Sequence, residues 1–189
     1  MRTPVLRPLL VALALGAPAG ALAEHAHEHG VAELRVALEG ATLLVEFESP
    51  LSNLVGFEHV PRSDDEKAAL ADLARTLRDP ARLIVLSEQA GCRPGEIELE
   101  LPDGHDHADH GHDHGGHDHR SEHGHHHDDD DGHGDAYVAW EFHCVRAPEA
   151  IELRVIEAFP DVRALRVETA GPRGQSAQRV EQPRVRLAL

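Results

Sequence analysis

The 189-residue sequence predicts an α+β fold: two related ββαββ-like half-units of mostly antiparallel sheet, joined by a disordered His/Asp-rich loop. Three observations favour it. Short segments of alternating apolar and polar residues recur on both sides of residues 103–135, one longer segment has helical spacing, and the tetrapeptide Glu-Leu-Arg-Val occurs at 33 and again at 152. One continuous sheet without internal symmetry fits this pattern equally well. The expected divisions are an export signal at 1–23, half-units at 24–102 and 136–189, and the loop at 103–135.

Residues 1–23 have the pattern of an export signal. Arg2 and Arg7 precede an apolar run at 9–17, and the Ala-Leu-Ala sequence at 21–23 matches the small-x-small pattern after which signal peptidase cuts. The apolar run is shorter than the roughly 20 residues that a membrane-spanning helix needs, which disfavours a retained anchor helix. We therefore expect a periplasmic protein without a membrane anchor, whose mature chain begins near Glu24.

The first half-unit contains the clearest element signals. Alternation at 31–38 and 41–47 predicts a β-hairpin. Ser63 and Glu66 form a capping-box pattern at the start of a helix that ends before Pro80. The other elements expected in this half are a short helical turn or loop at 51–57 and strands at 83–86 and 96–101.

The second half-unit repeats this order in shorter form. Residues 137–144 and 151–155 alternate, and residues 159–162 occupy the place of the turn that follows the first hairpin. Two further strands are expected at 165–168 and 179–187, on either side of a Gly-Pro-Arg-Gly sequence.

Cys92 and Cys144 are the two cysteines of the chain. They are not in C-x-x-C spacing, and a zinc–thiolate site would need more than one cysteine close by. Because an oxidising periplasm permits disulfides, this even pair predicts a Cys92–Cys144 disulfide in preference to free or metal-bound thiols. The bond would close across the loop and tie its two ends to one scaffold.

The segment at 103–135, which we call the insert, carries most of the charge. Ten aspartates and one glutamate against one arginine give it a formal charge of −10, out of −16 for the chain. It has almost no apolar surface to bury, so we expect a mobile loop. Neutral imidazole is a common ligand for zinc and also serves nickel, copper and cobalt. The candidate ligands are the twelve insert histidines: His105, His107, His110, His112, His114, His117, His119, His123, His125, His126, His127 and His133.

Metal capture is the favoured function of the insert. Recurring H-x-H and H-x-x-H spacings allow a mobile chain to place four ligands around one tetrahedral ion in many registers. A solvated spacer is the alternative, but a spacer has no need of histidine. Calcium fits less well, because the aspartates at 128–131 lack the register and the closing Glu of an EF-hand loop.

Five histidines lie outside the insert. His25, His27 and His29 form an H-A-H-E-H sequence near the start of the mature chain, where their clustering predicts metal ligands. His59 and His143 each stand alone, and a lone histidine is more often structural. Both remain candidate ligands beside the N-terminal three.

The sequence offers little for catalysis or for nucleic acid binding. It has no G-x-S-x-G, no H-E-x-x-H and no phosphate-cradling glycine loop. A disordered loop also lacks the rigidity of a catalytic metal site. The acidic balance would repel polyanions. We therefore expect neither an enzyme nor a nucleic acid-binding protein.

Several motifs together resemble a known family. They are His27-Glu28-His29-Gly30 before a strand, Ser49-Pro50 followed by Asn53-Leu54-Val55-Gly56-Phe57-Glu58-His59, a cysteine on each side of the insert, and residues 137–144 with the later Phe159-Pro160. In these features the chain resembles the ZrgA-type periplasmic zinc-uptake accessory proteins of Gram-negative bacteria, long described only as a domain of unknown function. The resemblance implies a pseudo-twofold, two-lobed fold with a mobile His-rich loop. It also implies that His59 is a ligand at a structured site, with the N-terminal histidines as companions.

These inferences combine into one functional hypothesis. The protein captures Zn(II) on the insert and on a more ordered His site and supports zinc uptake, with metal-uptake transporter components as partners. Within metal handling, the alternative is storage or detoxification, or a chaperone for nickel, copper or cobalt. Outside metal handling, the alternative is an interaction module in which the insert is a spacer.

Overall fold

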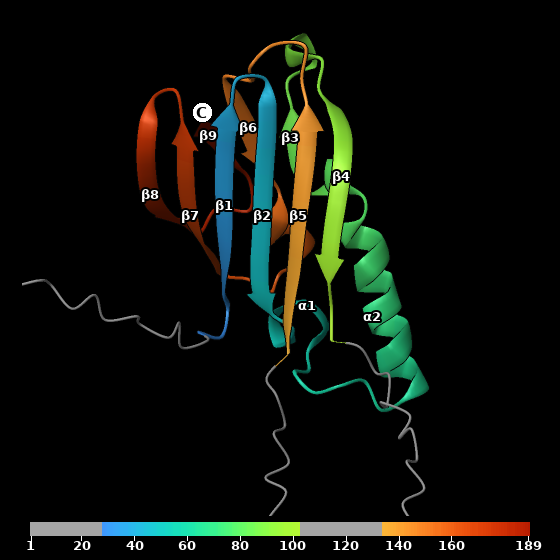
Figure 1. Ribbon diagram of the computed structural model, residues 1–189. Helices are drawn as coiled ribbons and strands as arrows, with labels where there is room; N and C mark the ends of the chain where they lie inside the picture. Colours follow the sequence, from blue (N-terminus) through green and yellow to red (C-terminus); the bar gives the residue numbers. More distant parts are fainter. Residues whose placement is uncertain (1–27, 103–133) are drawn as a thin grey trace, which may run out of the picture.

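The computed structural model describes residues 28–102 and 134–189 (Figure 1). The strands are β1 (Val31–Glu39), β2 (Thr42–Pro50), β3 (Ile84–Leu86), β4 (Arg93–Glu100), β5 (Asp135–His143), β6 (Ala150–Leu153), β7 (Ala164–Gly171), β8 (Gly174–Val180) and β9 (Val185–Ala188). The helices are α1 (Ser52–Val55), α2 (Asp64–Leu77) and α3 (Val155–Ala158), with short 3₁₀ turns η1 (Pro80–Arg82) and η2 (Glu88–Ala90). The predicted export signal, His25, His27 and the insert histidines His105 to His133 lie outside the described residues.

Six strands form one sheet in the order β4-β5-β2-β1-β7-β8. Neighbours are antiparallel except for β1 and β7, which are parallel. Three of the strands precede the insert and three follow it, so both halves of the chain share this sheet. Because β4 and β5 pair directly, with Ile97 opposite Trp140, the insert is the connection between two adjacent antiparallel strands.

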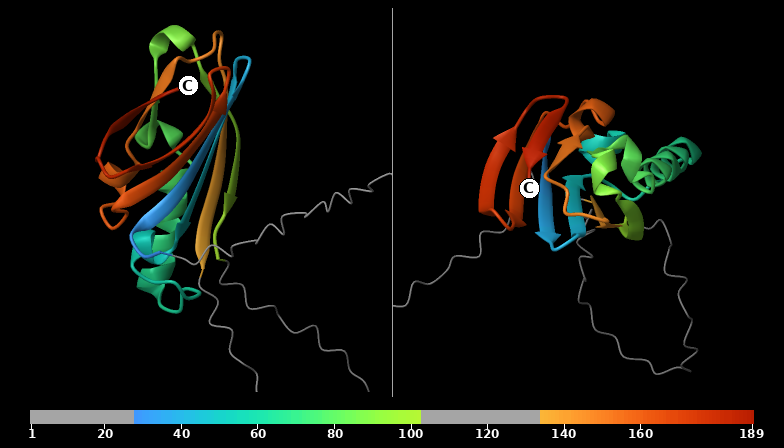
Figure 2. Two further views of the ribbon diagram at one scale, coloured as in Figure 1. Left: turned by 90° about the vertical axis from the view of Figure 1, so that its left-hand side faces the viewer. Right: turned by 90° about the horizontal axis from the view of Figure 1, so that it is seen from above.

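A second layer covers one face of this sheet. It consists of α2 and a three-stranded sheet in the order β3-β6-β9 (Figures 1 and 2). Phe47 and Trp140 are fully buried between the layers, with ring centroids 6.3 Å apart. The indole Nε1–H of Trp140 donates to the carbonyl oxygen of Leu77 at 2.7 Å. The end of α2 is therefore fixed against the large sheet by apolar packing and by a buried hydrogen bond.

Helix α2 begins at the predicted capping box. Ser63 Oγ accepts the N–H of Glu66 at 3.2 Å, and Glu66 Oε2 accepts the N–H of Ser63 at 2.9 Å. The predicted apolar stripe faces inward, because Leu73 and Leu77 are buried. Among the described residues, no helix has the length and apolar character to cross a membrane.

The single strand predicted at 179–187 is wrong. Strand β8 ends at Val180 and pairs with β7, whereas β9 begins at Val185 and pairs with β6 in the small sheet. Pro183 lies in the break between them, where the lack of an N–H does not interrupt a ladder. The second Glu-Leu-Arg-Val sequence is also not wholly extended, since β6 ends at Leu153 and Val155 begins α3.

The mixed α+β class is confirmed, and most of the described chain is strand. The pairing differs between the two halves: β1 and β2 form a hairpin, whereas β5 and β6 lie in different sheets. Over residues 28–102 and 134–189, the strand arrangement does not show the pseudo-twofold relation that the resemblance implies.

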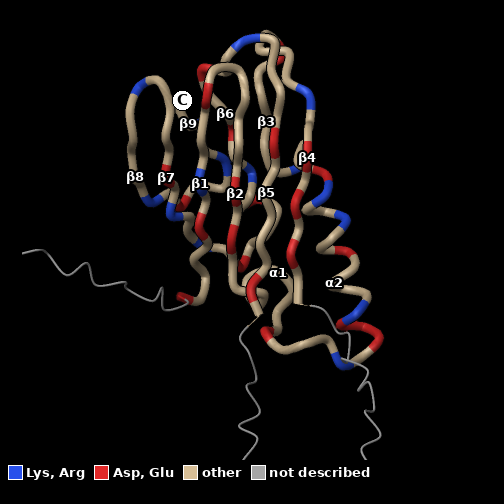
Figure 3. The backbone as a smooth tube through the Cα atoms, viewed as in Figure 1, with Lys and Arg blue, Asp and Glu red and all other residues tan. Residues whose placement is uncertain are grey.

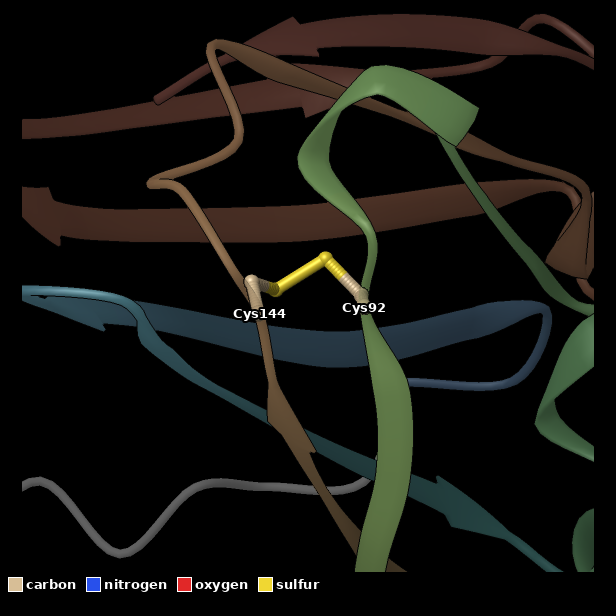
Figure 4. The surroundings of a disulfide bond; sticks show 2 residues. All are labelled: Cys92 and Cys144. Carbon is tan, nitrogen blue, oxygen red and sulfur yellow. A yellow bond between two sulfur atoms is a disulfide. The ribbon is translucent and has the colours of Figure 1, made fainter.

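The predicted Cys92–Cys144 disulfide is present (Figure 4). The two cysteines lie just outside one pair of ends of β4 and β5, whereas the insert connects the opposite ends, beyond Glu100 and Tyr137. The β4–β5 ladder therefore holds the two ends of the insert side by side, and the disulfide closes the far end of the hairpin. A disulfide is consistent with export to an oxidising compartment.

Candidate metal site at the base of the insert

The insert is attached at one end of the large sheet (Figure 1). We call this end the insert pole and define it by residues 28–31, 51–59, 102 and 134. The N–H of Gly134 donates to the carbonyl oxygen of Glu58 at 2.8 Å, and the carbonyl of Gly134 accepts the N–H of Leu51 at 2.9 Å. A Cβ at position 134 would lie 2.6 Å from Pro102 Cγ and 2.9 Å from Glu58 O. The close approach of the insert to the 51–58 segment therefore requires glycine.

His29 is presented by a tight turn at the start of β1. The N–H of Val31 donates to the carbonyl oxygen of Glu28 at 3.0 Å, and Gly30 has a φ of 80°. A side chain at position 30 would be strained by this positive φ. The Glu28 carboxylate pairs with Arg166 on β7 and lies 3.9 Å from Arg179 Nη1 on β8. The turn is thus anchored to the sheet while the His29 side chain is 72% exposed.

His29 and Glu58 form the first histidine–carboxylate pair. His29 Nδ1 lies 3.5 Å from Glu58 Oε1. The Ser52 hydroxyl donates to the same Oε1 at 2.6 Å and lies 3.5 Å from His29 Nδ1. The Glu58 side chain is only 19% exposed, and Ser52 of α1 orients its carboxylate. An exposed imidazole and an oriented carboxylate are two of the ligand types that zinc uses.

His59 forms a second pair with Glu66 of α2. Its Nε2 lies 3.7 Å from Glu66 Oε1, and its ring stacks on Phe57 with centroids 5.3 Å apart. Its Nδ1 lies 3.0 Å from the carbonyl oxygen of Val60, and a carbonyl only accepts. In the neutral ring, Nδ1 therefore carries the hydrogen and Nε2 is the nitrogen available to a metal.

The carboxyl of Glu66 is kept ionised by the helix start. Its pKa is lowered chiefly by the backbone N–H groups of Ser63 and Arg62, and to a smaller extent by His59. Glu66 Oε2 accepts both of these N–H groups, at 2.9 and 2.7 Å. The capping box therefore orients Oε1 toward His59.

The separations in both pairs are close to those of a zinc site. Ligands at about 2.0–2.1 Å from a tetrahedral ion lie about 3.3 Å from each other. The observed values are 3.5 Å for His29–Glu58 and 3.7 Å for His59–Glu66. Each pair therefore supplies two donors that need to move only slightly to bind one ion, and two further ligands must come from elsewhere.

His143 lies at the other end of the sheet. It is the last residue of β5, opposite Thr42 of β2, and its Nε2 lies 3.3 Å from Glu141 Oε1. The ring packs over Gly95 of β4, where a Cβ would lie 3.0 Å from Nε2. The structure therefore separates His143 from His29 and His59 by the length of β5.

Residues 28–102 and 134–189 contain no group of three or more His, Cys, Asp or Glu side chains that could hold a metal ion. The carboxylate partners of the two histidines depend on the fold: Glu58, the sequence neighbour of His59, faces His29, and His59 faces Glu66. The one sequence signal for Glu66 was the capping box, which indicates a structural role.

The outer face of the large sheet is acidic around Tyr137. Glu48 and Glu100 are its register neighbours on β2 and β4, and acidic residues run along β2, β4 and β5 (Figure 3). Tyr137 donates to Glu46 Oε1 at 3.1 Å, and its pKa is raised by burial and then by the charge of Glu46. The negative potential of this face favours the approach of cations.

A disulfide-closed α+β scaffold thus carries histidine–carboxylate pairs at the base of a His/Asp-rich insert, and these are ligand types that a metal-handling protein would need. The chain belongs to the ZrgA family of zinc uptake proteins, whose family model matches residues 26–189. This confirms the resemblance found in the sequence. No curated protein matches the chain. The family gives the protein a role in zinc uptake.

Proposed function

We propose that the protein is a periplasmic zinc-binding protein in which the insert captures Zn(II) and passes it to an ordered site at the insert pole. His29 and Glu58 form the core of this site, and His59 with Glu66 forms a second pair beside it. The loaded protein then delivers zinc to components of the uptake machinery. The acidic outer face and the −10 charge of the insert both favour divalent cations.

The observation that carries the proposal is the double role of Glu58. Its backbone carbonyl accepts the N–H of Gly134, the penultimate residue of the insert, while its carboxylate lies 3.5 Å from the His29 imidazole. An ion held by the insert near its base is therefore within a short distance of an oriented histidine and carboxylate. No long-range motion of the scaffold is needed for transfer.

The pair also explains why an insert is needed. Two donors fill two of the four coordination positions of a tetrahedral zinc ion, so the remaining ligands come from mobile histidines or from water. His27 precedes His29 by two residues, and the insert histidines lie between Pro102 and Gly134. An incomplete ordered site releases its ion more readily than a closed structural site, as delivery to a transporter requires.

Calorimetric titration of the mature chain with Zn(II) tests this function. One variant replaces the twelve insert histidines by asparagine, which preserves length and charge, and a second combines His29→Ala with Glu58→Gln. We expect several ions per wild-type chain, about one in the insert variant, and loss of that last ion when the variants are combined. An unchanged zinc stoichiometry in the insert variant would contradict capture by the insert, and retention of the last ion in the combined variant would contradict the ordered site.

A further inference from the structure

Asn53 is buried at the insert pole and bonds to the turn that presents His29. It is 4% exposed, and with Ser49 it makes up the buried polar residues of the described chain. Its Oδ1 accepts the N–H of Gly30 at 2.7 Å. Its Nδ2 donates to the carbonyl oxygen of Val31 at 3.0 Å and to Ser49 Oγ at 3.3 Å. A four-residue helix and the first residues of β1 are therefore joined by one side chain.

The turn is held from a second side by the loop before β7. The carbonyl oxygen of Gly30 accepts the N–H groups of Arg163 and Ala164 at 2.8 and 3.0 Å. The Arg163 side chain covers Gly30, where a Cβ would lie 2.5 Å from Arg163 Nε. With Asn53 on the other side, the backbone next to His29 has little freedom to move.

Helix α1 therefore positions both members of the first pair. Ser52 donates to the Glu58 carboxylate at 2.6 Å, and the adjacent Asn53 holds the backbone of the residue after His29. The separation between His29 Nδ1 and Glu58 Oε1 is thus set by two neighbouring residues of one helix. We propose that Asn53 is a positioning residue for zinc, which keeps His29 at ligand distance from Glu58. This inference rests on the proposed function of the pair.

The chemical reason is preorganisation. A ligand that is already oriented loses less conformational freedom when it binds an ion, so removal of its support weakens affinity without removal of a ligand. Groups that orient metal ligands typically contribute about 10- to 100-fold in metal affinity. A purely structural asparagine would instead stabilise the fold and leave the zinc affinity of His29 unchanged in the folded protein.

The test follows His29 directly in the full mature chain. Histidine is labelled with ¹³C, the Cε1–H resonance of His29 is assigned by its loss in His29→Ala, and free Zn(II) is set with nitrilotriacetate buffers. Because the buffer fixes free zinc, binding by the insert does not distort the midpoint. We expect Asn53→Ala to raise the free zinc needed for half-saturation of His29 by about tenfold or more.

Three variants separate positioning from stability. Leu38→Ala shortens a buried side chain at the end of β1 opposite the insert pole, and we expect no change in the His29 midpoint. Ser49→Ala removes one bond of Asn53 but leaves those to Gly30 and Val31, and we expect less than about a threefold change. Asn53→Asp keeps an acceptor for the Gly30 N–H, and we expect an intermediate midpoint. If Asn53→Ala does not fold, the His29 midpoint of Asn53→Asp tests the positioning role instead.

The outcomes distinguish the two proposals. A His29 midpoint that stays within twofold of wild type in Asn53→Ala and Asn53→Asp overturns the positioning role and leaves the proposed function intact. An equal shift in Leu38→Ala also overturns the positioning role, because the effect would then follow stability. A His29 resonance that does not respond to zinc in the wild type overturns the ordered site itself, and the positioning role with it.

Discussion

The amide nitrogen of Gly134 lies 2.8 Å from the carbonyl oxygen of Glu58. This hydrogen bond joins the C-terminal end of the insert to the residue whose carboxylate faces His29. The sheet brings the N-terminal end to the same place, since Pro102 would touch any side chain at position 134. The insert, which is the segment richest in histidine, is therefore hydrogen-bonded directly to one residue of the ordered histidine–carboxylate pair.

Gly134→Ala tests this junction. The added Cβ meets Pro102 and the backbone of Glu58 at less than 3 Å, so the insert end must move away from the 51–58 segment. We expect a loss of about 1–3 kcal/mol in the free energy of unfolding, measured with urea, and weaker zinc binding at His29. Gly171→Ala is the matched control, because its Cβ would make only an ordinary 3.5 Å contact with Leu38. Equal stability of the two variants would contradict the tight junction.

Replacement of both cysteines by serine separates fold stability from zinc binding. The disulfide joins residues 52 apart in sequence, and its loss should lower the free energy of unfolding by about 4 kcal/mol. Because it lies at the far end of the β4–β5 hairpin, the zinc affinity of His29 in the folded variant should match that of wild type. A large drop in that affinity would show that the two ends of the hairpin are coupled.

Glu66→Gln tests the charge at the start of α2. The folded protein lowers the pKa of Glu66 below its ordinary 4.5, so the ionised carboxylate stabilises the fold. This contribution is fully present above about pH 4.5 and is lost as the pH falls through the lowered pKa. We expect wild type to have the higher melting temperature at pH 7, with the difference shrinking below pH 4.5. Asp65→Asn controls for loss of a negative charge in the same helical turn, and a pH-independent difference would refute the assignment.

Zinc on the insert should be released by mild acid. Imidazole binds zinc only when neutral, and its unperturbed pKa is about 6.5. Zinc therefore binds above this value and dissociates as the pH falls from about 6.5 toward 5.5. Equilibrium dialysis of the mature chain across this range measures the bound zinc. Full stoichiometry retained near pH 5 would indicate sites made mainly of carboxylates.

Local patterns predicted the local elements well. The β1–β2 hairpin, the capping box of α2 and the disulfide all depend on neighbours in sequence or on compartment, and all three are confirmed. The assignment of strands to sheets was not predictable in this way. The parallel pairing of β1 with β7, and the separation of β5 from β6, depend on packing between residues more than 100 positions apart or on a change of layer.

The site illustrates the same limit. His59 and Glu58 are adjacent in sequence, but successive side chains in a non-helical segment point in different directions. Glu58 instead faces His29, a residue 29 positions earlier, because α1 and the turn at Gly30 are joined through Asn53. The number of histidines and their clustering were visible in the sequence. The pairing of each histidine with a carboxylate depends on the fold and could not be predicted from the sequence.

The most direct test of zinc transfer to the insert pole is a backbone amide NMR titration of the mature chain with Zn(II). If the insert delivers zinc to the ordered pair, the amide resonances of His29, Gly30 and Glu58 should shift together as zinc is added. Those of Gly171 and Gly174, in the β7–β8 turn at the far end of the sheet, should remain in place. Saturation of the insert with no change at His29 or Glu58 would contradict the transfer.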